Sequence, residues 1–267
     1  MLVLTLCYRI IGFVREMLVA SYLGTSAEAD AYSIAYSVPT VVVEMLALGA
    51  IGSASIAVFQ SVLQKDGKQR LNQLYSRVMA AILLALAALL LLCELGAPLL
   101  TKLMAPSFSG EKMALTVSMV RSMLPAILFV GVLGLQKAAL NLMGDFRSEG
   151  ISNVVFNCAM VAGVLFAARQ DRIDILIHSF IAAAFLQWLV QFRSVRRVGL
   201  RPSPDLHLRD EDLHRIFVLL IPIMFSTVVS QISPVAARAV ASTHSAGMNW
   251  ESRTASLSGR RKSSSLG

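Results

Sequence analysis

The stretch "YRIIGFVREMLVASYLG", residues 8–24, places Arg9, Arg15 and Glu16 inside a segment that otherwise has the composition of a membrane-spanning helix. A helix needs about 20 mainly apolar residues to cross a bilayer. An ionisable side chain at mid-membrane costs on the order of 3 kcal/mol, so it usually faces a water-filled cavity or a partner. These three charges therefore bear on both the fold and the function.

The composition of the whole chain supports a membrane protein. Of its 267 residues, 56% are hydrophobic and 15% are charged, whereas soluble domains are about half apolar and a quarter charged. Several segments are long and apolar enough to cross a bilayer, so the sequence predicts an all-α, polytopic transmembrane helical bundle. The first apolar stretch lacks the basic region that precedes a cleaved signal peptide, and we expect it to be retained.

The apolar segments divide the chain into candidate spans. Four prolines, Pro39, Pro125, Pro222 and Pro234, lie inside these spans, where they are expected to kink helices or open cavities. We expect seven spans, at residues 2–23, 30–62, 76–103, 113–143, 150–168, 173–192 and 213–242.

These spans predict a six-helix transmembrane lobe followed by the start of a second lobe. The expected domains are the N-terminal lobe at 1–192, a cytoplasmic linker at 193–212, the first helix of a C-terminal lobe at 213–243, and a Ser-rich tail at 244–267. Most loop lysines and arginines lie on one side of this arrangement, notably in "QFRSVRRVGLRPSPDLHLRDEDLHR" (191–215). The positive-inside rule therefore predicts a cytoplasmic N-terminus.

Several function classes lack support in the sequence. The net charge of +8 comes mostly from loops between spans, so topology explains it better than a nucleic-acid partner. Cys7, Cys93 and Cys158 lie in apolar stretches without paired or metal-type spacing, which predicts buried thiols and no disulfide. No catalytic motif, metal site or cofactor site is recognisable. We expect a protein that is not an enzyme and has no cofactor, with coupling to an ion gradient or the membrane potential left open.

The charges in the first span admit two interpretations. On a helix, Arg9 and Glu16 differ by roughly 20° in azimuth and about 10 Å in height, so they share a face. Gly12 lies near that face and would let another helix or a substrate come close. The three charges either neutralise one another or reach toward the interface, or they line a cavity that binds an anion. Arginine suits phosphate because its planar group offers paired donors.

Other charged residues in the spans are further site candidates. Asp30 either marks the start of the second span or faces the cavity and pairs with Arg9 or Arg15. Glu44 takes part in coupling to protons or cations, or pairs with a basic group such as Lys137. Arg238, in the seventh predicted span, could reach the cavity from the opposite side.

The segment "YRIIGFVREMLVASYLGTSAEADAYSIAYSVPT" resembles the opening of the MurJ/MviN lipid II flippase family, within the multidrug/oligosaccharidyl-lipid/polysaccharide exporter superfamily. The likeness covers roughly residues 8–243. The residues that carry the shared pattern are Arg9, Gly12, Arg15, Glu16, Gly24, Asp30 and Pro39.

The resemblance implies two pseudo-symmetric bundles around a central cationic cavity. It implies alternating access that carries an undecaprenyl-pyrophosphate-linked cell-wall precursor outward across the bacterial cytoplasmic (inner) membrane. Arg9 and Arg15 match the family's functional arginines, and Asp30 matches their acidic partner. The expected partners are the lipid bilayer, the lipid-linked glycan precursor and proteins of cell-wall synthesis.

Two departures from the family pattern leave alternatives open. Val43 and Leu48 stand where the family usually has a basic and an acidic residue, and the Ser-rich tail replaces an expected arginine-bearing stretch. We therefore expect a truncated N-terminal half whose tail is disordered or frame-shifted. The alternatives are a polysaccharide-lipid or drug exporter of the same superfamily, and a non-transporting truncated membrane protein.

Overall fold

A computed structural model describes residues 2–24, 26–45, 48–203 and 210–221. Within these ranges the secondary structure is helical and contains no strand, which confirms the all-α prediction. Residues 211–221 are also helical. The other helices are α1 (Leu2–Leu23), α2 (Ala27–Met45), α3 (Leu48–Lys65), α4 (Gly67–Met104), α5 (Gly110–Met123), α6 (Ala126–Gly131), α7 (Leu133–Leu142), α8 (Arg147–Gln170) and α9 (Ile173–Arg197).

Some of these helices have the length and composition to cross a membrane. In the described part of the chain, α4, α8 and α9 meet this requirement. Helices α5, α6 and α7 together make a fourth candidate span, which is bent by 45°. Helix α1 is as long as a span but carries the three charges Arg9, Arg15 and Glu16. On α4, Leu91, Leu95 and Leu99 are 66%, 81% and 64% exposed. Leucines this exposed along a span suit contact with lipid.

Two of the predicted spans contain more than one described helix. The span predicted at 30–62 holds most of α2 and nearly all of α3, and residues 46–47 between them lie outside the described residues. The predicted span 113–143 bends at Pro125 as expected, since proline disrupts a continuous helix. It is interrupted again between α6 and α7, which the sequence did not predict.

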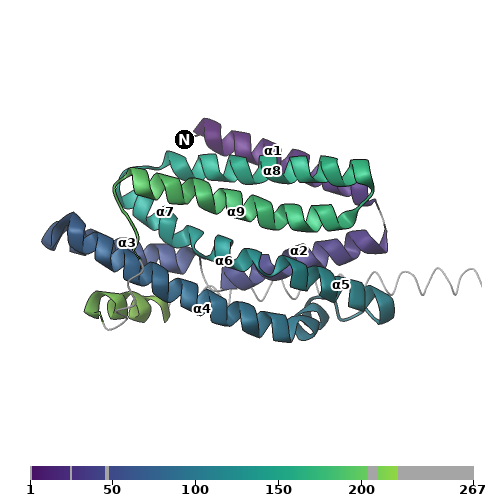
Figure 1. Ribbon diagram of the computed structural model, residues 1–267, viewed down its shortest axis with the longest axis horizontal. Coiled ribbons are helices and arrows are strands. Elements are labelled where there is room, and N and C mark those ends of the chain that lie inside the picture. The colour runs from purple at the N-terminus through teal and green to yellow at the C-terminus, as the bar shows by residue number, and fades with distance from the viewer. Residues whose placement is uncertain (1, 25, 46–47, 204–209, 222–267) are drawn as a thin grey trace, which may run out of the picture.

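The helices pack in pairs along a common direction. Helices α1, α8 and α9 lie side by side, α2 packs on α5, α3 packs on α7, and α4 runs along the opposite side of the molecule (Figure 1). Glycines permit the closest approaches. A Cβ at Gly163 of α8 would lie 2.3 Å from the Ser179 side chain of α9, and one at Gly52 would lie 3.4 Å from the Gly134 carbonyl oxygen.

The segment after α9 returns to the start of α4 and is bonded to it. Asn72 Nδ2 donates to the Arg201 carbonyl at 3.1 Å, and the Arg201 N–H donates to Asn72 Oδ1 at 2.6 Å. Lys68 Nζ donates to the Val198 carbonyl at 2.8 Å. The first five residues of the predicted linker 193–212 belong to α9.

Asp210 completes this attachment. Its side chain is 1% exposed, and it accepts hydrogen bonds from Arg70 Nη2 at 2.9 Å and from Arg77 Nη1. Asp212 also accepts from Arg70 Nη2, at 3.0 Å. Leu213, Ile216 and Leu220 are buried, so one face of the helix at 211–221 packs against the lobe. The rest of the predicted second lobe and the tail at 244–267 lie outside the described residues.

Candidate functional site

Arg15 lies at the junction of α1, α2 and α8. Its side chain is 13% exposed, and its Nη2 donates to Glu16 Oε1 at 3.2 Å. The guanidinium carbon lies 5.7 Å from the centroid of the Tyr36 ring and 5.9 Å from that of Phe156. Aromatic faces attract such a cation. Arg15 therefore has one carboxylate partner, which is itself 72% exposed, and a low-polarity wall behind it.

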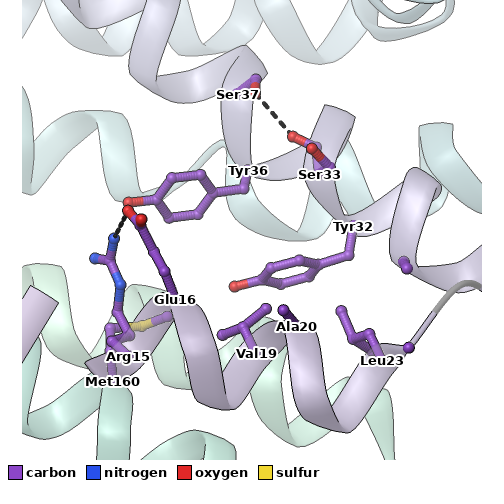
Figure 2. A pocket seen from close by; sticks show the side chains of 12 residues that line it. Arg15, Glu16, Val19, Ala20, Leu23, Tyr32, Ser33, Tyr36, Ser37 and Met160 are labelled. Atoms are coloured by element: carbon purple, nitrogen blue, oxygen red, sulfur yellow. Dashed lines mark hydrogen bonds and ion pairs between the residues drawn. The ribbon is translucent and has the colours of Figure 1, made fainter. Parts of the chain in front are cut away.

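A first hollow opens beside Arg15. Its volume is about 330 Å³, and Figure 2 shows the Arg15–Glu16 pair next to Tyr36, with Tyr32 further along the hollow. Its remaining wall includes Ser33, Ser37 and Met160. The hydroxyl groups and the guanidinium give it several hydrogen-bond donors.

A second hollow lies on the other side of the same pair. Its volume is about 410 Å³, and Arg9, Gly12, Arg15 and Glu16 line it together with side chains of α8. Arg9 is exposed and has no ion-pair partner in the described part of the chain. Gly12 lets α8 approach, because a Cβ there would lie 3.4 Å from Asn157 Oδ1. Two guanidinium groups against one carboxylate leave this region with a positive charge.

A third hollow shares the lining residue Asn153 with the second and is lined by amide side chains. Its volume is about 440 Å³. Gln187 Nε2 donates to Asn153 Oδ1 at 2.8 Å, and Asn153 also lines the second hollow. Gln191 Nε2 donates to Ser152 Oγ at 2.9 Å, and the Gln191 Oε1 is buried without a protein partner. These residues were missed in the sequence, although amides in apolar spans are a usable signal.

A small apolar cavity lies next to these hollows and has a volume of about 150 Å³. Tyr36, Phe156 and Gln187 line this cavity, and each of them also lines one of the three hollows. Pro39 and Val43 also contribute to its wall. Val43 is 3% exposed, so the position where the family usually carries a basic residue is here part of an apolar surface.

The structure brings together only some of the candidate site residues. Arg9, Arg15 and Glu16 line the same hollow. Asp30 does not pair with either arginine in this structure, because α2 packs on α5 and Lys112 Nζ donates to its Oδ2 at 2.6 Å.

Lys137 lines the third hollow and pairs with Glu149 Oε1 at 2.5 Å. The side chain of Glu44 and the whole of Arg238 lie outside the described residues. No group of three or more His, Cys, Asp or Glu that could hold a metal ion occurs in the described ranges. The arrangement is a positively charged hollow on α1 next to a polar hollow in which Lys137 and Glu149 form an ion pair.

Comparisons with known proteins agree on one family. The family model described as "Lipid II flippase MurJ" matches residues 19–255. The lipid II flippase MurJ of Burkholderia cenocepacia is 27% identical over 237 residues, which cover 86% of this chain and 46% of that protein. The probable lipid II flippase MurJ of Haemophilus influenzae is also 27% identical, over 86% of this chain and 47% of that protein.

A solved structure shares the fold. It is titled "Lipid II flippase MurJ, inward closed conformation", has a TM-score of 0.75 and 23% sequence identity, and is matched over 90% of this chain and 50% of its own. The chain spans about half the length of the relatives it matches.

Proposed function

The chain belongs to the lipid II flippase MurJ family, and from this membership we propose that it acts as the N-terminal lobe of a membrane flippase. The cargo is a polyprenyl-pyrophosphate-linked cell-wall precursor of the lipid II kind, carried across the cytoplasmic membrane by alternating access. The relatives are named as flippases, which are transporters and not catalysts. The membrane bilayer and the lipid-linked precursor are the partners of this activity.

The observation that carries the proposal is the arginine site on α1. Arg15 faces two hollows and is only 13% exposed, and Arg9 lines one of them without a carboxylate of its own. A pyrophosphate would neutralise the excess positive charge and accept hydrogen bonds from both guanidinium groups. Because the surroundings are partly apolar, such hydrogen bonds are stronger than they would be in water.

The amide-lined hollow suits the uncharged part of the same cargo. Lys137 and Glu149 neutralise each other, so this hollow carries no net charge. The amide groups of Asn153, Gln187 and Gln191 offer both donors and acceptors, which fit sugar hydroxyl and acetamido groups. Since Asn153 lines both hollows, a head group could place its phosphates at Arg15 and its sugar at Gln187.

A binding measurement on the purified chain tests the phosphate site. Native mass spectrometry would compare undecaprenyl pyrophosphate with undecaprenol, which lacks the phosphates. Arg15→Gln should weaken binding of the pyrophosphate about tenfold, since it removes hydrogen bonds to a charged group. Arg9→Gln, at a more exposed position, should weaken it about threefold. Glu16→Gln should strengthen it, because a competing carboxylate is removed.

The control is Arg169→Gln, at the exposed last turn of α8 and away from the hollows. It should leave the preference for pyrophosphate unchanged. Equal binding of both lipids by the wild-type chain, or indifference to Arg15→Gln, would contradict the proposed phosphate site.

The charge of the site also bears on the alternative cargo. A cavity that binds cationic drugs would need excess acidic groups, whereas the hollows on α1 contain two arginines and one glutamate. The anionic lipid-linked precursor is therefore favoured over a drug. Roles for Glu16, Glu44 and Lys137 in coupling to an ion gradient, substrate contacts by Asp30 and Arg238, and partners among the cell-wall synthesis proteins stay predictions.

We place the protein in the bacterial inner membrane with its N-terminus in the cytoplasm. The ends of the helices that hold Lys65, Lys68, Arg147 and Arg196 lie together at one end of the bundle, where the chain also begins (Figure 1). Such clustering of basic residues supports a cytoplasmic location for that end.

A further inference from the structure

A groove on the opposite side of the lobe differs in character from the arginine site. It lies between α4, α6 and α9 and has a volume of about 580 Å³. Its wall is mainly apolar and includes Met79, Leu83 and Leu84 of α4. None of its lining residues lines the hollows around Arg15. The groove is therefore separate from the proposed transport site.

Aromatic rings form one wall of this groove and end at an arginine. Phe129 packs on Trp188 with 5.9 Å between ring centroids, and Trp188 stacks on Phe192 at 5.2 Å. The guanidinium carbon of Arg196 lies 5.8 Å from the centroid of the Phe192 ring. An apolar wall thus leads along α9 to a cation at the helix end.

The polar end of the groove is formed by Ser76 and by Pro202 and Ser203. Arg201 precedes Pro202 in the chain, and both Arg196 and Arg201 are exposed. Neither guanidinium has an ion-pair partner in the described part of the chain. The nearby carboxylates of Asp210 and Asp212 are already held by Arg70 and Arg77, so they do not neutralise these arginines.

We propose that this groove is a binding site for an anionic phospholipid of the cytoplasmic leaflet. Its acyl chain lies against Leu83, Leu84 and Trp188, and its phosphate lies between Arg196 and Arg201. Leu83 and Leu84 are 42% and 52% exposed on a helix that can span the membrane, so the groove opens where lipid chains would be. Its basic end is the end placed in the cytoplasm above, and that leaflet carries the anionic lipids.

Trp188 makes the site directly measurable. The sequence contains one other tryptophan, Trp250, so Trp250→Phe leaves Trp188 as the only reporter. The full chain with this change would be reconstituted in phosphatidylcholine vesicles that contain a fixed fraction of brominated lipid, since bromine quenches tryptophan at short range. Brominated phosphatidylglycerol should quench Trp188 more strongly than brominated phosphatidylcholine at the same fraction.

Removing the charges should remove this preference while the groove remains. Arg196→Gln and Arg201→Gln should each reduce the preference for phosphatidylglycerol about fivefold. Both side chains are exposed, and circular dichroism should show unchanged helix content. The matched control is Arg169→Gln with Arg172→Gln, two exposed arginines where α8 and α9 meet, which should keep the preference. Equal quenching by both lipids, or a preference that survives loss of Arg196 and Arg201, would overturn the proposal.

Discussion

Asp210 shows how one buried carboxylate can hold a segment that the sequence marks as a connection. Its side chain is 1% exposed and lies between Arg70 and Arg77 of α4. Burial alone would raise the pKa of Asp210, but hydrogen bonds from Arg70 and Arg77 outweigh it and hold the pKa below its usual value of 3.8. The folded state therefore stabilises the ionised form of this residue.

Asp210→Asn should lower the free energy of unfolding by about 2 kcal/mol, because it leaves two guanidinium groups without their shared carboxylate. The measurement is chemical unfolding in detergent followed by tryptophan fluorescence. Asp174→Asn is the control, because its carboxylate is 63% exposed and lies 3.6 Å from Arg172. That change should alter stability by less than about 0.5 kcal/mol. A loss of the same size in both variants would contradict a special role for Asp210.

The same residue predicts a pH dependence with a definite sign. A carboxyl group whose pKa is lower in the folded state contributes stability at and above its unfolded pKa, and this contribution is lost as pH falls through the folded pKa. The stability difference between the wild-type chain and Asp210→Asn should thus be full at pH 7. It should shrink as the pH falls below about 4. A difference that stays constant down to pH 2 would argue against an ionised Asp210.

At this scale the sequence predicts positions best where they depend on the spacing within one helix. Helical spacing predicts that Arg9 and Glu16 share a face of α1, and in the structure both line the second hollow with Arg15. The partners of Asp30 and Lys137 depend instead on which helices pack together, and these partners are Lys112 and Glu149. Such pairings between helices leave no periodic signal in a single sequence.

Helix α8 packs against α9 over much of their lengths, and a glycine sets their separation. Gly163 faces Ser179, whose Oγ donates to the Ile175 carbonyl within α9. Helices in membranes commonly approach through small residues, since lipid and protein side chains are about equally apolar. Because Asn153, Gln187 and Gln191 are carried by these two helices, their separation also sets the shape of the amide-lined hollow.

Gly163→Ala should destabilise the lobe by about 1–3 kcal/mol, because the added Cβ overlaps the Ser179 side chain and forces the helices apart. Gly96→Ala is the matched control on α4, where a Cβ meets nothing within 4 Å. It should be neutral or slightly stabilising, as alanine favours helix more than glycine does. With Cys7 and Cys158 replaced by serine, the labelling rate of the buried Cys93 reports the unfolding of each variant. Equal labelling rates in both glycine variants would exclude the close contact.

The helices themselves and the bend at Pro125 were largely predictable, but the break between α6 and α7 was not. Helices α8 and α9 begin and end within about five residues of the expected spans, because long apolar runs mark them clearly. The bend at Pro125 follows from the missing N–H of proline. The break after Gly131 occurs inside an apolar run, where hydropathy alone gives no signal.

At the scale of the whole molecule, the helix ends that hold Lys65, Lys68, Arg147 and Arg196 lie at one end of the bundle (Figure 1). Charge asymmetry across the spans predicts that this end faces the cytoplasm, and this orientation stays a prediction. Exposed glutamines are available at both ends, with Gln69 near the start of α4 and Gln170 at the end of α8.

Cysteines at these positions test the orientation. In a chain whose native cysteines are replaced by serine, a membrane-impermeant maleimide added to intact cells should label Gln170→Cys and not Gln69→Cys. Both positions should react once the membrane is permeabilised, which is the control for accessibility. The reverse labelling pattern would place the N-terminus outside.

The break between α6 and α7 has a consequence for the amide-lined hollow. Val132 separates the two helices, and Gly134, two residues further on, lines that hollow together with Gly52 of α3. A Cβ added at Gly52 would lie 3.4 Å from the Gly134 carbonyl oxygen. At this point the wall of the hollow is main chain, so added bulk at Gly52 would press on the backbone that directly follows the break.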